Sequence, residues 1–244
     1  MFHLFTVEKE TYSLLKKIFA ISTINEKFAL DGGTSLALQL GHRQSIDLDI
    51  FSPESFETRD IQVLLSSTAG LDFEFVNSNQ KMLFAFINQI KCDFVQEPAK
   101  LINPFVDYDG VKYFSVEDIA AMKMHTVCGR GKEKDFFDSY ALIETFGWQQ
   151  MLQGFEQKYD SIQLYSLWRS IVYFEDAEED VDIRGFDPFT KSWKEIKEFI
   201  LKECRQSINF YLSILKSSSN PVNTFSPESF LSKPCIISIL PLLR

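Results

Sequence analysis

The chain has 244 residues, enough for one large or two small domains, and carries a net charge of −9. This charge excludes an overall basic field that would attract nucleic acid, so RNA or DNA would have to bind at a local patch. The four cysteines form no Cys-x-x-Cys pair and no zinc-type spacing, which favours a reduced, cytoplasmic protein. We expect neither a signal peptide nor a membrane span, because the N-terminus lacks a basic start followed by a long apolar run, and the apolar stretch at 235–243 is too short.

Hydrophobic spacing and turn residues predict a first half that mixes helices and strands. Gly41 is expected to end the helix that follows the glycine pair at 32–33. In chain order, the predicted elements are a helix over 8–22, a strand over 27–31, a helix from Thr34 or Ser35 to Leu40, a strand over 46–51, a helix over 58–66 and strands over 71–76, 82–87 and 90–95.

Residues 96–114 look like a loop, and the remainder of the chain is predicted to be helical. Ser115 and Asp118 form a helix-start signal, and Gly129-Arg130-Gly131 interrupts the helical pattern. Further helices are predicted over 134–146, 149–158, 161–174 and 190–215, with a loosely ordered tail after 217. The expected fold is therefore α+β, with a sheet-containing domain at 1–147, a helical region at 148–216 and a tail at 217–244.

The most informative segment is Gly32-Gly33-Thr34-Ser35, which opens an apolar helix. Glycines allow the backbone to approach a phosphate closely, and a helix N-terminus presents free N–H groups and the positive end of the helix dipole. We predict that these four residues bind the phosphates of a nucleotide. A plain turn is the alternative for the glycine pair taken alone.

Asp47 and Asp49 follow on the predicted strand at 46–51. Because side chains alternate along a strand, the two carboxylates should project side by side while Ile46, Leu48 and Ile50 face the core. Neighbouring carboxylates repel each other unless a cation lies between them, and Mg²⁺ takes carboxylate and phosphate oxygens together. Solvated aspartates on an exposed face are the alternative, but the order strand, turn, helix, strand favours a nucleotide site.

Asp93 is the expected third carboxylate. It lies within the apolar strand IKCDFV, and a pair of metal ions needs about three carboxylates to hold and neutralise it. Asp72 is the alternative, but it stands at the start of a strand. An edge residue facing solvent remains the other interpretation of Asp93.

Polar residues among apolar ones mark the helix pair after Ser115. Cations there could bind triphosphate oxygens and offset charge on the leaving group, whereas a solvated helix face is the alternative. Lys123 and Asp138 are candidates for catalysis, Arg130 and Lys134 for nucleotide binding, and Asp135 and Asp138 could also hold these cations in ion pairs.

Three other polar segments are expected to be structural or solvated. His42 and Arg43 should lie at the surface, although Arg43 could reach a phosphate of the nucleotide or of a tRNA. His125 is two residues from Lys123 on a predicted helix and therefore points away from it. The acidic connector at 175–182 is expected to be a solvated loop.

Taken together, these motifs resemble those of the AbiEii/AbiGii toxin family of nucleotidyltransferases, from type IV toxin–antitoxin and phage-defence systems. The similarity covers about residues 25–145 and rests on GGTSLALQLGHRQSIDLDIF at 32–51, Asp93 in KCDF and AAMKMHTVCGRGKEKDFFDSY at 120–140. It implies a polymerase-β-like nucleotidyltransferase fold, NTP as substrate, Mg²⁺, and a cognate antitoxin as partner. Some members of the family modify the acceptor end of tRNA.

Carried over by position, the resemblance implies that Gly32, Gly33, Thr34 and Ser35 hold the triphosphate, that Asp47, Asp49 and Asp93 hold the metals, and that Lys123, Lys134 and Asp138 fall on the second motif block. Two other functions stay open at this point. A nucleotidyltransferase for a small molecule should have a closed acidic pocket, whereas an RNA enzyme should carry a basic stripe. A nucleotide- or partner-binding module without turnover is the second alternative.

Overall fold

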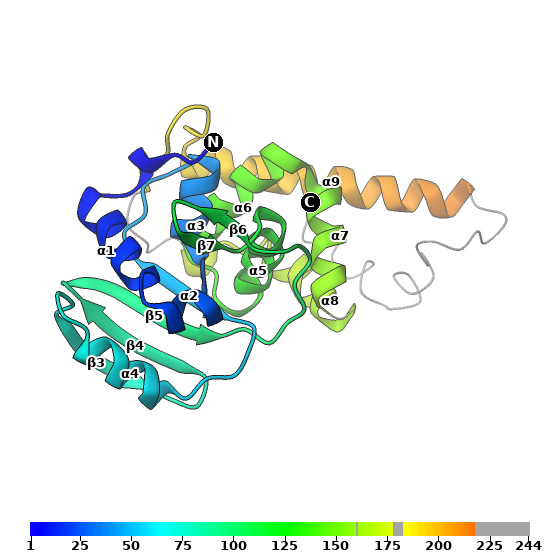
Figure 1. Ribbon diagram of the computed structural model, residues 1–244. Coiled ribbons are helices and arrows are strands. Elements are labelled where there is room, and N and C mark those ends of the chain that lie inside the picture. Colours follow the sequence, from blue (N-terminus) through cyan, green and yellow to red (C-terminus); the bar gives the residue numbers. More distant parts are fainter. Residues whose placement is uncertain (160, 178–182, 218–244) are drawn as a thin grey trace. The chain divides into compact units, whose positions relative to one another are not determined.

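A computed structural model describes residues 1–159, 161–177 and 183–217 (Figure 1). Internal contacts divide the chain into two units. The first contains residues 1–120 and 183–190, and the described part of the second contains 121–159, 161–177 and 191–217. The division after residue 120 falls within helix α5 (Val116–Gly129), whereas the sequence suggested a boundary at 147.

The first unit is built on a seven-stranded mixed sheet, which confirms the α+β prediction. The strand order is β3-β4-β5-β2-β1-β7-β6. The pairs β1–β7 and β2–β5 are parallel and the others antiparallel. The strands are β1 (Ala29–Asp31), β2 (Leu48–Ser52), β3 (Phe73–Ser78), β4 (Met82–Ile87), β5 (Ile90–Gln96), β6 (Val106–Tyr108) and β7 (Val111–Tyr113).

One face of this sheet forms the core of the unit together with α1 (Lys9–Phe19), α2 (Ser22–Lys27) and α4 (Thr58–Ser67). Figure 1 shows α4 lying along β3 and β4, with which it is in contact. Apolar side chains recur at helical spacing on α1, while its lysines stay outside. The buried cluster contains Leu15 and Ile18 of α1, Ile24 of α2, Ile61 and Leu65 of α4, and Leu30, Leu48, Ile50, Leu83 and Phe94 of the strands.

Strand register assigns residues to the two faces of the sheet. Leu30 pairs with Ile50, and Ile50 with Phe94, so these fully buried side chains share the core face. The neighbouring register positions therefore project from the opposite face. On that face Asp49 is the register partner of Asp31 on one side and of Asp93 on the other.

Helix α3 (Gly32–Leu40) begins directly after β1 and ends at Gly41, whose φ of +77° lies in the left-handed region. Glycine is favoured there, as the sequence predicted. The predicted start of α5 is also confirmed, because the Asp118 backbone N–H donates to Ser115 Oγ at 3.1 Å. The buried Asp118 carboxylate in turn accepts hydrogen bonds from the backbone N–H groups of Ile102 and Asn103.

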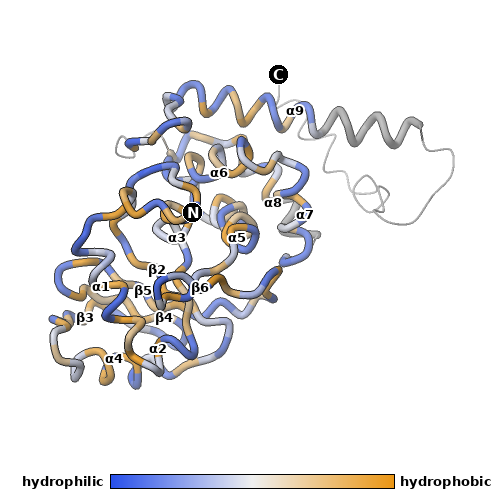
Figure 2. Tube along the Cα trace, turned by 45° about the horizontal axis from the view of Figure 1, so that its top comes forward, coloured by the Kyte–Doolittle hydropathy of each residue, from blue (hydrophilic) through white to orange (hydrophobic). Residues whose placement is uncertain are grey.

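The second unit is helical in its described part. Its α6 (Glu133–Phe146) is buried over nine consecutive residues, from Asp135 to Ile143, and Phe136 of this helix contacts the rings of Phe174 and Trp193. Figure 2 shows hydrophobic and hydrophilic stretches alternating along the first part of α9 (Trp193–Ser217), whose Ile196, Ile200 and Cys204 are buried at a spacing of four. The remaining elements are most of α5, α7 (Trp148–Lys158), α8 (Ser161–Ser170) and the short 3-10 helix η2 (Glu175–Ala177).

Three predictions at the level of elements were wrong. The segment 22–27 is a separate helix, α2, that the pattern did not indicate. Strand β2 begins at Leu48, so Ile46 lies outside it and is 59% exposed instead of facing the core. The predicted loop at 96–114 contains the hairpin β6–β7, whose Asp109 and Gly110 both have positive φ, as in a type I′ turn.

Residues 178–182 of the acidic connector and the tail after 217 lie outside the described residues. Among the helices that are described, none combines the length and apolar character that crossing a membrane requires.

Candidate functional site

The glycine turn at the start of α3 is tightly packed. Gly32 has a φ of +69°, and a Cβ atom there would lie 2.1 Å from Asp49 Oδ2. A Cβ at Gly33 would lie 2.4 Å from Arg43 Nη2. Gly32 therefore excludes a side chain, for backbone conformation as well as for space, whereas a side chain at Gly33 would require the Arg43 guanidinium to shift. The lack of side chains brings the backbone at the α3 N-terminus against the Asp49 carboxylate.

Thr34 and Ser35 are buried and face the protein. The Thr34 hydroxyl contacts the backbone carbonyl of Asp47 and lies 2.8 Å from Ser45 Oγ, which ties the start of α3 to the segment before β2. Ser35 Oγ accepts from Gln39 Nε2 at 3.1 Å. These side chains brace the turn, so a phosphate at this helix end would meet backbone N–H groups.

Three aspartates form a row across neighbouring strands on the face opposite the core. Asp31 ends β1, Asp49 lies in β2 and Asp93 in β5, each at a register position beside the next. Adjacent strands are about 4.8 Å apart, so the row brings several carboxylates within the range of strong mutual repulsion. Asp31 and Asp93 are 3% and 8% exposed, which reduces screening by water. The sequence reasoning missed Asp31, although it stands directly before the glycine pair.

Lys91 provides a positive charge beside this row. It is two residues from Asp93 on β5, and its Nζ lies 2.5 Å from Asp93 Oδ2. Partial burial alone would lower the pKa of Lys91, but the hydrogen bond to Asp93 and the charges of Asp93, Asp49 and Asp47 raise it. Asp47, which lies one residue before β2 and is half-buried, therefore acts on the same ammonium as the other two carboxylates. The sequence analysis also missed Lys91, although the spacing Lys-x-Asp on an apolar strand predicts that the two side chains share a face.

The carboxylates fit a hard divalent cation in the chemistry of their donors. Asp93 Oδ1 is buried and has no hydrogen-bond partner among the described residues, a costly state that a cation would relieve. Mg²⁺ prefers carboxylate oxygens of this kind. Within residues 1–159, 161–177 and 183–217, no three His, Cys, Asp or Glu side chains are gathered closely enough to hold a metal ion, and the cation nearest Asp93 is Lys91.

His42 and Arg43 are buried, at 0% and 6% exposure, so their predicted surface location was wrong. The segment from 42 to 45 packs under the glycine turn. There Arg43 Nη1 donates to the Gln44 carbonyl at 2.9 Å, and Arg43 forms a backbone bridge with Gly185. Arg43 thus supports the turn through its contact with Gly33.

The second unit holds its own candidate residues in a buried ion-pair network. Lys123 Nζ lies 2.7 Å from Asp138 Oδ2 and 3.4 Å from Asp135 Oδ1, and both carboxylates are fully buried. Arg130 is exposed and its Nε lies 3.4 Å from Asp135 Oδ2. Lys134 is half-buried. The geometry matches the interpretation in which the two aspartates hold the cations in ion pairs.

His125 also lies in the second unit, where its ring stacks on Tyr159 with a centroid distance of 4.4 Å and an interplanar angle of 12°. This contact is consistent with a structural role for His125 in packing against the Tyr159 ring.

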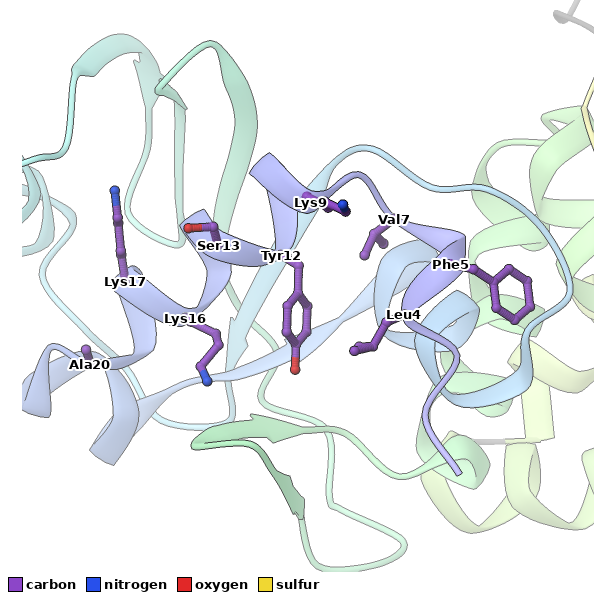
Figure 3. A pocket seen from close by; sticks show the side chains of 9 residues that line it. All are labelled: Leu4, Phe5, Val7, Lys9, Tyr12, Ser13, Lys16, Lys17 and Ala20. Carbon is purple, nitrogen blue, oxygen red and sulfur yellow. The ribbon is translucent and has the colours of Figure 1, made fainter.

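A hollow of about 750 Å³ lies elsewhere in the first unit, over η1 (Leu4–Thr6) and α1 (Figure 3). Figure 3 shows Tyr12 and Lys16 pointing to the same side of α1. Both contact Asp109 in the β6–β7 turn, at 3.0 and 2.7 Å, and burial together with Asp109 raises the pKa of Tyr12 to about 12. None of the candidate carboxylates lines this hollow.

Comparison with known proteins matches the chain to a family. Residues 13–206 match the family described as nucleotidyl transferase AbiEii toxin, type IV toxin–antitoxin system. An uncharacterised protein of Aquifex aeolicus (strain VF5) is 30% identical over 206 residues, which cover 82% of this chain and 97% of the relative.

Two solved structures share the fold. A Helicobacter pylori protein described as a candidate nucleotidyltransferase aligns over 86% of this chain and 100% of its own, with 16% identity and a TM-score of 0.52. MenT4, a nucleotidyltransferase toxin from Mycobacterium tuberculosis H37Rv, aligns over 97% of this chain and 95% of its own, with 12% identity and a TM-score of 0.50. At these identities the likeness concerns the fold.

The packing of Gly32 against Asp49 leads to a first prediction. Gly32→Ala adds both backbone strain and an overlap with Asp49 Oδ2, whereas Gly110→Ala, at a φ of +79° in open space, adds only the strain. We expect Gly32→Ala to lower the free energy of unfolding by about 1–3 kcal/mol more than Gly110→Ala, and to weaken NTP binding. Urea denaturation and nucleotide titration measure the two effects, and equal losses in both variants would contradict the steric argument.

The contact between Lys91 and Asp93 leads to a second prediction. An ammonium on Asp93 competes with a metal ion, so Lys91→Met should bind Mn²⁺ about 3- to 10-fold more tightly than the wild type. Isothermal titration calorimetry without nucleotide measures this affinity. The exposed Lys81, changed to Met, is the control for loss of a positive charge. An unchanged or weaker affinity in Lys91→Met would show that the ammonium does not compete.

The buried network of the second unit leads to a third prediction. Lys123→Met leaves the Asp135 and Asp138 carboxylates buried without their main cation, which should lower the free energy of unfolding by about 3–5 kcal/mol. Lys132→Met, at an exposed position just before α6, should change it by less than about 0.5 kcal/mol. Chemical denaturation followed by circular dichroism compares the two. A loss below about 1 kcal/mol for Lys123→Met would contradict a structural role for this lysine.

Proposed function

The chain belongs to the AbiEii family of nucleotidyltransferase toxins, and on that premise we propose that it transfers a nucleotide from an NTP to a hydroxyl of tRNA, with Mg²⁺ as cofactor. In this reaction the acceptor oxygen attacks the α-phosphorus in line with the leaving group. A new O–P bond forms, the bond between the α-phosphorus and its bridging oxygen breaks, and pyrophosphate leaves.

The row Asp31, Asp49 and Asp93 beside the glycine turn is the observation that carries the proposal. A turn without side chains at a helix N-terminus suits the triphosphate, and carboxylates next to it suit the cations that accompany a triphosphate. The two features are joined through the close approach of Gly32 to Asp49. A purely structural turn would not need carboxylates crowded against it.

The candidate residues of the first unit divide the tasks of the proposed reaction among them. Backbone N–H groups at Gly32–Ser35 bind phosphate oxygens, and Arg43 and Thr34 keep that turn rigid. Asp93 orients the acceptor hydroxyl and accepts its proton, which then passes to solvent. Positioning of this kind supplies much of the rate in phosphoryl transfer.

Asp47, Asp49 and Asp93 would hold the metal once their side chains close around it, since no three such side chains of the described residues are yet near enough to do so. The bound cation would supply positive charge at the phosphate oxygens. Lys91 would have to give up its contact with Asp93 for that carboxylate to hold a cation. The exposed lysine side chain, at 45% exposure, has room to move away.

The tRNA acceptor and the biological setting extend this proposal. The family is one of toxins in type IV toxin–antitoxin systems, so we propose a cognate antitoxin protein as partner and a role in phage defence. Modification of tRNA would account for toxicity by blocking translation. The acidic net charge requires that tRNA binds at a local surface of the molecule.

Transfer of label tests the proposal. Purified full-length protein is incubated with Mg²⁺, each α-³²P-labelled NTP in turn and total bacterial tRNA. We expect one or more nucleotides to label the tRNA, and Asp49→Asn and Asp93→Asn to reduce the rate by about 100-fold or more because a negatively charged ligand is lost. Asp107→Asn, an exposed aspartate on β6 of the same sheet, should keep the wild-type rate.

Label in tRNA with the wild type and the Asp107 variant but not with the other two would support the proposed site. Binding of NTP without labelling of tRNA would overturn the tRNA acceptor and indicate a small-molecule or protein acceptor. Equal labelling by Asp49→Asn and the wild type would overturn the assigned role of the carboxylates.

A further inference from the structure

The carboxylate row continues beyond Asp93 onto strand β4. Phe84 is the register partner of Asp93, and Phe86 is the register partner of Lys91 two residues along the same strands. Register partners project from the same face, so both phenylalanines lie on the carboxylate side of the sheet. In register order, Asp31, Asp49, Asp93 and Phe84 therefore follow one another across four adjacent strands.

Strand β4 is apolar on both faces, although helices cover only one of them within the first unit. Leu83, Ala85 and Ile87 are buried on the core face. On the opposite face Phe84 is half-buried and Phe86 is 38% exposed. An antiparallel strand with one open face ordinarily alternates apolar and polar residues, so aromatic residues on the open face need another reason.

The order of these residues across the strands indicates from which side each substrate would approach the carboxylates. Gly32 meets Asp49, so the phosphate-binding turn lies toward β1 and β2. Asp93 is one strand further on, and Phe84 one strand beyond that. Because in-line attack brings the acceptor from the side opposite the leaving pyrophosphate, the acceptor approaches Asp93 from the β4 side.

We propose that Phe84 and Phe86 form a stacking platform for the nucleobases at the single-stranded 3′ end of the acceptor RNA. The inference rests on the proposed function and names how its acceptor is held. Each base presents an aromatic face, and aromatic side chains on an open sheet bind single-stranded RNA in this way with little dependence on sequence. Adjacent strands lie about 4.8 Å apart, roughly the reach from a base across its ribose to the sugar hydroxyl, so a base stacked on Phe84 would place its sugar hydroxyl near Asp93.

A platform of this kind reconciles an RNA substrate with an acidic protein. Stacking does not require a basic surface, and the neighbouring strand β5 carries Lys91 beside Phe86 as a local positive charge. The affinity for RNA would come mainly from the bases and only in small part from the phosphates. The affinity for RNA should therefore fall less steeply with salt concentration than is usual for a protein that acts on RNA.

Kinetics with tRNA as the varied substrate test the platform. Phe86→Ser should raise KM for tRNA about 10-fold and leave the Kd for NTP unchanged. Phe75→Ser is the matched control, because Phe75 is 46% exposed on the neighbouring strand but belongs to the opposite face, as the register partner of Ala85. It should behave as the wild type does. Phe86→Trp, which keeps an aromatic face, should retain a KM near the wild-type value.

A second acceptor sharpens the result. A blunt-ended RNA duplex offers no unpaired bases, so the wild type should favour tRNA over the duplex, and Phe86→Ser should lose most of that preference. Equal KM values for Phe86→Ser and Phe75→Ser would overturn the platform, as would a loss of NTP affinity in Phe86→Ser. If the wild type labels no RNA, the proposed acceptor is refuted. If the wild type labels RNA and Phe86→Ser does so with the same KM, only the platform is refuted.

Discussion

The register of strand β2 between β1 and β5 is the constraint on which the site depends. Side chains alternate between the faces, so the same register that buries Leu30, Ile50 and Phe94 places Asp31, Asp49 and Asp93 together on the other face. A slip of one residue would bring the carboxylates into the core and the aliphatic side chains out of it. The hydrophobic core thus enforces the alignment of the acidic row, and the row cannot be dispersed without unfolding that part of the sheet.

This alignment stores electrostatic repulsion. Asp31, Asp49 and Asp93 lie on three adjacent strands, two of them nearly buried, and Lys91 supplies one positive charge at Asp93. Repulsion among buried carboxylates is relieved by protonation, by a nearby cation or by hydrogen bonds. The register that buries the apolar core therefore also gathers the carboxylates whose repulsion a bound cation would relieve. In the second unit the negative charges are compensated within the protein, because Lys123 forms ion pairs with two fully buried aspartates.

The parts of the site that depend on local sequence could be predicted, and those that depend on strand pairing could not. Glycines before a helix and alternating aspartates can be recognised within a few residues of sequence. The family and the fold that they indicated are confirmed. The position of Asp31 in the row and the burial of Arg43 depend on contacts with β2 and Gly33, which are set by the tertiary fold. The β6–β7 hairpin was legible, since Asp109-Gly110 is a typical type I′ turn pair, but the surrounding prolines suggested a loop. The roles of Asp47, Asp49 and Asp93 stay predictions.

The sheet also gives the proposed reaction a direction. A symmetric cluster of carboxylates could accept phosphate from either side, but here one flank is the turn of Gly32 and the other is Phe84. Backbone N–H groups bind charged phosphates. An aromatic ring stacks on a base but offers a phosphate no hydrogen bonds to replace its bound water. In the proposed reaction, the two flanks would therefore separate the two substrates, with the NTP on the side of Gly32 and the RNA on the side of Phe84. Because the two flanks are linked through the four adjacent strands β1, β2, β5 and β4 of one sheet, their spacing is fixed by the strand separation and does not depend on a moving loop.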